Sequence, residues 1–121
     1  MVEFTLATSA FFLLIFGAIG FGQVIFQYNI VANAAKAAVR WTVVRGSSSG
    51  QTAATASQVH DFIVTQMNGF SEVDSVTWSP DTKQGAIVTV IVRSSYTTPS
   101  VPLLKSYNVK LRSAAQMVIM R

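Results

Sequence analysis

The sequence predicts an α+β fold, in which a long N-terminal helix precedes a short helix packed on a small antiparallel sheet of about three strands. Three observations predict it: an uncharged run over residues 4–35, an amphipathic segment over residues 52–68, and alternating β-branched segments after residue 75. The 121 residues suffice for one domain plus an appendage. We therefore expect a long hydrophobic helix over residues 1–45 and a small α+β head over residues 46–121.

The first segment is predicted to be helical from Glu3 to about Arg45, because no proline interrupts it. Its uncharged part would extend roughly 48 Å at about 1.5 Å per residue, more than the roughly 30 Å of a bilayer core. Hydropathy peaks in "AFFLLIFGAIGFG", falls through a mixed stretch, and ends in the basic "AAKAAVRWTVVRG". Gly17, Gly20 and Gly22 would permit close helix packing and mark a place for local unwinding or bending.

The next segments predict a linker and a second helix. "GSSSGQ" (residues 46–51) is typical of a flexible connection. From about Thr52 to Asn68, apolar residues recur at helical spacing, and Asn68-Gly69 is a plausible helix end. This helix should pack on the sheet through Val59, Phe62, Ile63 and Met67.

The remaining segments predict strands. "SVTWS" places Val76 and Trp78 on one face, and "SPDTKQG" predicts a turn. "AIVTVIVRSSY" predicts a central strand, covered in part on both faces. "TTPSVPLL" contains two prolines and predicts a connection. The last segment alternates, with one face expected to carry Tyr107, Val109 and Leu111 and the other Asn108, Lys110 and Arg112.

The composition excludes several kinds of chemistry. The chain has no cysteine, which excludes disulfides, thiol catalysis and cysteine metal sites. Its net charge of +4 is spread without a basic block, so no specific nucleic-acid partner is predicted. His60 and Asp61 are neighbours on a helix and should diverge. Glu72 and Asp74 form either a weak cation site or, preferably, a solvated edge. We predict no catalytic residue, no cofactor and no metal, and hence no enzyme.

Two tryptophans, Trp41 and Trp78, are expected in the core or an interface. The alternative for Trp41 is a position at a membrane boundary. Core packing is the preferred interpretation.

Glu3 stands alone before the uncharged run, because the next charged residue is Lys36. A buried unpaired carboxylate is costly. Glu3 could lie in headgroup water, or it could be favoured by the helix dipole. A third hypothesis pairs it with the α-amino group of a neighbouring subunit, which would fix the stagger between subunits.

The segments "VEFTL", "FFLLIFGAIGFGQ" and "NIVANAAKAAVRW" together resemble the N-terminal region of TadE-like proteins, which are type IV pilin-like proteins of Tad (Flp-type) pilus systems. Glu3-Phe4 matches the Glu-Phe pair that follows the prepilin peptidase site in that family. Phe16-Gly17 and Phe21-Gly22 match the Phe-Gly positions of its apolar helix. "LRSAAQMVIMR" is similar to the closing strand of the family. Ser9 stands where these proteins often have proline.

The resemblance implies a structural subunit that polymerises through its hydrophobic helix into an extracellular pilus filament, with Glu3 and Phe4 in subunit assembly. It implies storage in the inner membrane, a homo-oligomeric filament, and a prepilin peptidase and pilus assembly machinery as partners. Surface adhesion or motility would be its role. The alternatives are a minor or priming pilin, or a non-polymerising single-pass membrane protein with a small partner-binding domain.

Overall fold

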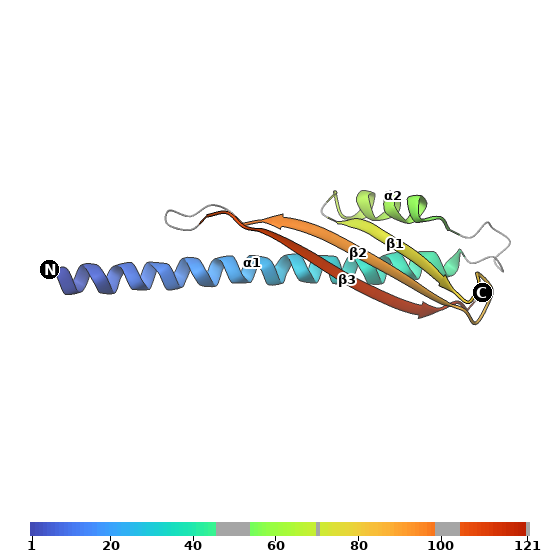
Figure 1. Ribbon diagram of the computed structural model, residues 1–121, viewed down its shortest axis with the longest axis horizontal. Helices are drawn as coiled ribbons and strands as arrows, with labels where there is room; N and C mark the ends of the chain where they lie inside the picture. Colours follow the sequence, from blue (N-terminus) through green and yellow to red (C-terminus); the bar gives the residue numbers. More distant parts are fainter. Residues whose placement is uncertain (46–53, 70, 99–104, 121) are drawn as a thin grey trace.

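The computed structural model describes residues 1–45, 54–69, 71–98 and 105–120. Two helices, α1 (Val2–Val44) and α2 (Ala56–Gln66), precede three strands, β1 (Glu72–Ser79), β2 (Ile87–Thr97) and β3 (Asn108–Val118). Figure 1 shows α1 as a long rod, with the sheet and α2 gathered along its C-terminal part. The predicted α+β fold is confirmed. The expected linker at residues 46–51 and most of the proline-containing connection lie outside the described residues.

α1 is one continuous helix, and its burial changes partway along. Phe16 and Phe21 are at least half exposed, whereas Val31, Ala34, Ala35, Ala38 and Val39 are essentially buried. Small side chains at spacings of three and four let the helix approach the sheet closely. The helix ends near Arg45, as predicted, where the backbone N–H of Arg45 donates to the carbonyl of Thr42 at 3.0 Å.

α2 covers the sheet through the predicted apolar stripe. Val59 and Ile63 are fully buried, and Phe62 and Met67 pack against the same core. The helix is shorter than predicted: it begins after Thr55, whose N–H donates to Gln58 Oε1 at 3.1 Å, and it stops at Gln66. Asn68 and Gly69 both have positive φ, which ends the helix. The Gly69 N–H closes this end by donating to the carbonyl of Val64 at 3.1 Å.

The sheet is antiparallel with the order β1-β2-β3, so the β-branched strand is central as predicted. Its inner face carries Val88, Val90 and Val92, all fully buried. These valines lie opposite Met117, Ala115 and Ser113 of β3. At the far end, Gly85 adopts φ +89° in the predicted turn, and its N–H donates to the carbonyl of Ile119 at 2.9 Å. The core therefore lies between this sheet face, α2 and the second half of α1.

The alternation predicted for the last strand is confirmed with one exception. Val109 and Leu111 are partly buried, and Asn108, Lys110 and Arg112 are exposed. Tyr107, expected beside Val109, is 64% exposed and precedes β3. Its backbone is held there because its N–H donates to Thr98 Oγ1 at 2.8 Å, and the Thr98 N–H donates to its carbonyl at 2.8 Å.

Candidate assembly surface

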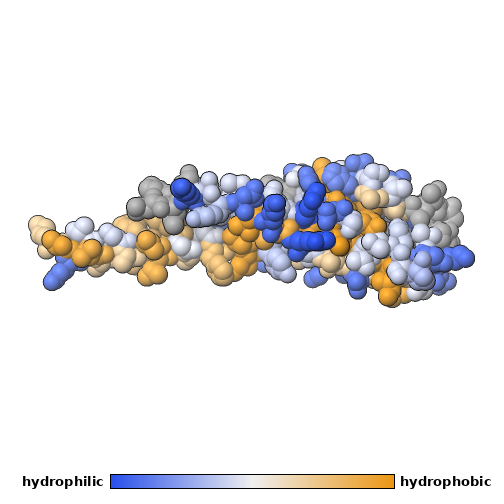
Figure 2. Space-filling view, viewed as in Figure 1, coloured by the Kyte–Doolittle hydropathy of each residue, from blue (hydrophilic) through white to orange (hydrophobic). Residues whose placement is uncertain are grey.

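The N-terminal half of α1 presents a bare apolar surface. Its Phe, Leu and Ile side chains from Phe4 to Phe26 are between 37% and 78% exposed. α1 is the helix, among the described residues, that is long and apolar enough to cross a membrane, and its most apolar stretch has no buried residue. Figure 2 shows the hydrophobic side chains concentrated along this half and hydrophilic ones over the head. An apolar surface this extensive marks a contact with lipid or protein.

The hydroxyl groups in this half are suited to an environment without water. Thr5 Oγ1 donates to the carbonyl of Met1 at 3.0 Å, Thr8 Oγ1 to Phe4 at 2.8 Å, and Ser9 Oγ to Thr5 at 2.8 Å. Each donor is satisfied within its own helix, which lowers the cost of placing it in lipid or in a helix bundle.

Glu3 and Phe4, the predicted assembly residues, lie side by side in the first turn of α1. Both are exposed, and Phe4 is 78% exposed. Within the described residues, Glu3 has no ion-pair partner. The carboxylate does stand at the positive end of the helix dipole. Its pairing with a neighbouring subunit stays a prediction.

Among the described residues, the glycines of this half make no close packing contact. A Cβ added at Gly17, Gly20 or Gly22 would meet no atom within 4 Å. α1 nevertheless continues through all three without interruption. Their expected role in close packing between helices therefore remains a prediction about assembly.

The C-terminal end of α1 belongs to the head. The rings of Trp41 and Phe62 stack at 5.1 Å between centroids with an interplanar angle of 18°. The Arg45 guanidinium lies 4.0 Å from the Trp41 ring centre. Trp41 and Trp78 both pack against the core. Core packing of both tryptophans is confirmed, and Trp41 links α1 to α2.

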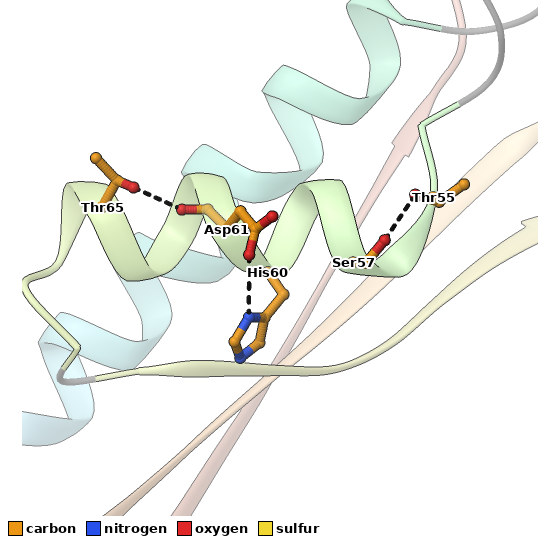
Figure 3. A network of polar contacts seen from close by, with 5 residues as sticks. All are labelled: Thr55, Ser57, His60, Asp61 and Thr65. Atoms are coloured by element: carbon orange, nitrogen blue, oxygen red, sulfur yellow. Dashed lines mark hydrogen bonds and ion pairs between the residues drawn. The ribbon is translucent and has the colours of Figure 1, made fainter.

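The polar residues of α2 form local contacts only. Figure 3 shows His60 Nδ1 facing Asp61 Oδ1, and the two atoms are 3.8 Å apart. The His60 side chain is 41% exposed and that of Asp61 is 85% exposed. The backbone carbonyl of Asp61 accepts from Thr65 Oγ1 at 2.8 Å, and Thr55 Oγ1 and Ser57 Oγ lie 3.0 Å apart. The described residues contain no group of three or more His, Asp or Glu placed to hold a metal.

The outer sheet face carries an ionic cluster that the sequence did not reveal. Arg93 and Arg112 are directly opposite in the β2–β3 register. A bulge between Val73 and Ser75 brings Asp74 to both arginines, at 3.2 Å and 3.4 Å. Asp74 thereby offsets the repulsion of two like charges on adjacent strands. The weak cation site considered for Glu72 and Asp74 is not formed, because Asp74 is already paired with these arginines.

A side-chain hydrogen bond joins β2 of the head to the middle of α1. Tyr96, near the end of β2, donates its hydroxyl proton to Gln23 Oε1 on α1 at 2.5 Å. Beside it, a groove of about 500 Å³ follows the edge of β2, where β1 pairs only as far as Arg93 while β2 continues to Thr97. We call it the edge groove. Its lining includes Gln27, Glu72, Arg93, Tyr96 and Lys110.

The family model of TadE-like proteins matches residues 1–40. This confirms the predicted resemblance over that stretch. No curated protein and no solved structure matches the chain. The matched residues contain the entire bare half of α1, including Glu3 and Phe4, and end inside the part that packs on the sheet.

The match and the apolar helix fit a pilin-like component of a Tad pilus system that associates with a membrane. The similarity expected for the C-terminal segment lies beyond the matched residues and stays a prediction. The sequence reasoning identified the bare helix from its uncharged run. It missed the Asp74 cluster, which depends on strand register, and the Tyr96–Gln23 hydrogen bond, which depends on how β2 packs along α1.

Proposed function

We propose that the protein is a structural pilin subunit that polymerises through α1 into an extracellular filament. The observation that carries the proposal is that no described residue covers the large apolar side chains of the N-terminal half of α1. Fully burying one Leu or Phe side chain is worth about 1.5–3 kcal/mol. Ten Phe, Leu and Ile side chains from Phe4 to Phe26 are half or more exposed, and together they give a strong drive toward lipid or toward other helices.

The two environments would be used in succession. Residues 4–22 extend about 28 Å as a helix, close to the roughly 30 Å of a bilayer core. The inner membrane would hold the subunit before assembly. A prepilin peptidase would process it, and the pilus assembly machinery would then add it to the filament. In the filament, the helices of neighbouring copies would replace the lipid. The head would face outward, supporting surface adhesion or motility in a non-enzymatic role.

Glu3 would set the stagger between copies by pairing with an α-amino group of its neighbour. Removing one partner of a buried ion pair costs about 3–5 kcal/mol, which is a hundredfold or more in an equilibrium constant. Conversion of Glu3 to glutamine should therefore abolish the filament while leaving the folded head and membrane insertion intact. Asp61→Asn provides the matched control, because Asp61 has an 85% exposed carboxylate on the head.

The experiment is electron microscopy of material sheared from cells that produce the natural chain, Glu3→Gln or Asp61→Asn, with the membrane fraction quantified in parallel. The proposal is supported if the natural chain and Asp61→Asn form filaments and Glu3→Gln does not. Membrane-bound chain without filaments in all three would refute polymerisation and favour the single-pass membrane protein. Filaments at a reduced number, confined to tips or initiation sites, would identify a minor or priming pilin.

A further inference from the structure

The edge groove lies at one particular level along α1, beside the end of the β2–β3 pair. We call this end, defined by Tyr96, Thr98, Lys105 and Tyr107, the hairpin end. Figure 1 shows the β2 arrow pointing toward the N-terminal half of α1, with its tip near the middle of the helix. The Tyr96–Gln23 hydrogen bond fixes this position, since Gln23 directly follows the apolar run that ends at Gly22. Gln27, on the groove wall, lies about 6 Å beyond Gln23 along the helix. When residues 4–22 span a bilayer core, the groove is therefore at headgroup depth.

The side chains at this level have the chemistry of a membrane interface. Tyr107 is 64% exposed at the hairpin end, and the Tyr96 hydroxyl donates a hydrogen bond to Gln23 on α1. Tyrosines are enriched where a membrane meets water, because the ring is apolar and the hydroxyl is polar. Lys105 and Lys110 are exposed there, and among the described residues neither has an ion-pair partner.

The charge balance of the groove favours an anion. Arg93 and Lys110 line it against the single carboxylate of Glu72. Arg93 and Arg112 share the single carboxylate of Asp74, so this cluster keeps one net positive charge. Lys110 and the nearby Lys105 add two positive charges against the one carboxylate of Glu72, which leaves the region with a net charge of +2. The groove volume of about 500 Å³ is within the roughly 300–1,000 Å³ of small-molecule sites.

We propose that the hairpin end and edge groove bind anionic phospholipid headgroups while the subunit is held in the membrane. The lipid phosphate would contact Lys110 and Lys105, with Tyr96 and Tyr107 at the interface. This inference rests on the membrane-held stage of the proposed function. The head is thereby docked on the membrane surface before assembly, and this contact must break when the subunit is extracted.

The test uses the full chain reconstituted in lipid vesicles. The chain has no cysteine, so a single introduced cysteine accepts a fluorescent label cleanly. Ser106→Cys reports on the hairpin end, Ser79→Cys on the opposite end of the sheet, and Phe12→Cys on the span. Quenching by aqueous iodide is compared in phosphatidylcholine vesicles and in vesicles that also contain phosphatidylglycerol.

In the anionic vesicles, we expect the Ser106 label to be protected and the Ser79 label to be quenched freely. Replacing Lys105 and Lys110 with glutamine should remove this protection, by about fivefold in the docked population for each lysine. The control replaces Lys36 and Lys83 with glutamine, because both are exposed and lie away from the hairpin end. This control variant should keep the protection of the Ser106 label.

Three results would overturn the inference. In the first, iodide quenches the Ser106 label as freely as the Ser79 label. In the second, protection of the Ser106 label does not depend on lipid charge or on the two lysines. In the third, inorganic phosphate protects the Ser106 label equally in neutral vesicles, which would assign the groove to free phosphate. The Phe12 label separates the two proposals. If it is protected while Ser106 is not, only the headgroup site fails; if it is exposed to iodide, the membrane stage of the proposed function fails.

Discussion

Truncating Val39 should destabilise the head, whereas truncating Leu14 on the same helix should not. Val39 is 1% exposed and Leu14 is 71% exposed. Val39→Ala removes two carbon groups from the core, worth about 0.8 kcal/mol each, and the cavity adds up to about 1 kcal/mol. The higher helix propensity of alanine returns about 0.5 kcal/mol. The free energy of unfolding should therefore fall by about 1–2 kcal/mol.

The assay is urea unfolding of the full chain in detergent micelles, followed by tryptophan fluorescence. Both tryptophans report on the head, because Trp41 stacks on Phe62 and Trp78 packs against the core. Leu14→Ala should change the free energy of unfolding by less than about 0.5 kcal/mol, as expected for an exposed position. In cells, the same variant should lower the yield of sheared filaments, because Leu14 lies on the assembly surface.

Two results would refute this division of α1. Equal destabilisation by the two variants would mean that the bare half packs against the head. No destabilisation by Val39→Ala would mean that the second half of α1 is not part of the core. Filament yield provides an independent readout, since Val39→Ala should lower it only in proportion to the loss of folded head.

Three further predictions concern single positions. Ser71→Ala should raise the free energy of unfolding by about 1–3 kcal/mol, because Ser71 is 1% exposed and its buried Oγ lacks a hydrogen-bond partner among the described residues; urea unfolding measures it, and a loss of stability would contradict the reasoning. Tyr96→Phe should accelerate amide exchange of Thr98 by about three- to tenfold, the effect of losing one hydrogen bond to Gln23; unchanged exchange would show that the link does not hold the hairpin. Gly20→Ala should stabilise α1 in micelles by about 1 kcal/mol, because its Cβ meets no atom; circular dichroism tests this, and a simultaneous fall in filament yield would place Gly20 at a close contact between helices.

Elements with strong local signals were predictable. The uncharged run, the stripe from Val59 to Met67 and the β-branched central strand each follow from periodicity within one segment. The start of α2 was placed too early, because the helix is capped at Thr55 by a capping box with Gln58. The side-chain environment of Tyr107 was also predicted wrongly, since β3 begins only at Asn108. Both errors concern element ends, which local pattern determines weakly.

The assembly surface was predictable in its position but not in its extent. Val31 and Phe26 are both apolar, and neither spacing nor hydropathy tells which one a sheet will cover. The structure distinguishes them, with Val31 fully buried and Phe26 64% exposed. The Asp74 cluster was beyond sequence reasoning for a related reason. Its formation needs a bulge in β1 and the register that sets Arg93 opposite Arg112.

Side-chain size along α1 explains how one helix serves two surfaces. Where the sheet covers it, the buried residues are small, with Ala34, Ala35 and Ala38 allowing the backbone close to β2 and β3. Where it is bare, large side chains such as Phe11 and Leu14 project outward. Because α1 is continuous and the head is packed on its second half, a contact that fixes the first half also fixes the head. A stagger set at Glu3 would therefore determine the spacing of heads on the filament surface.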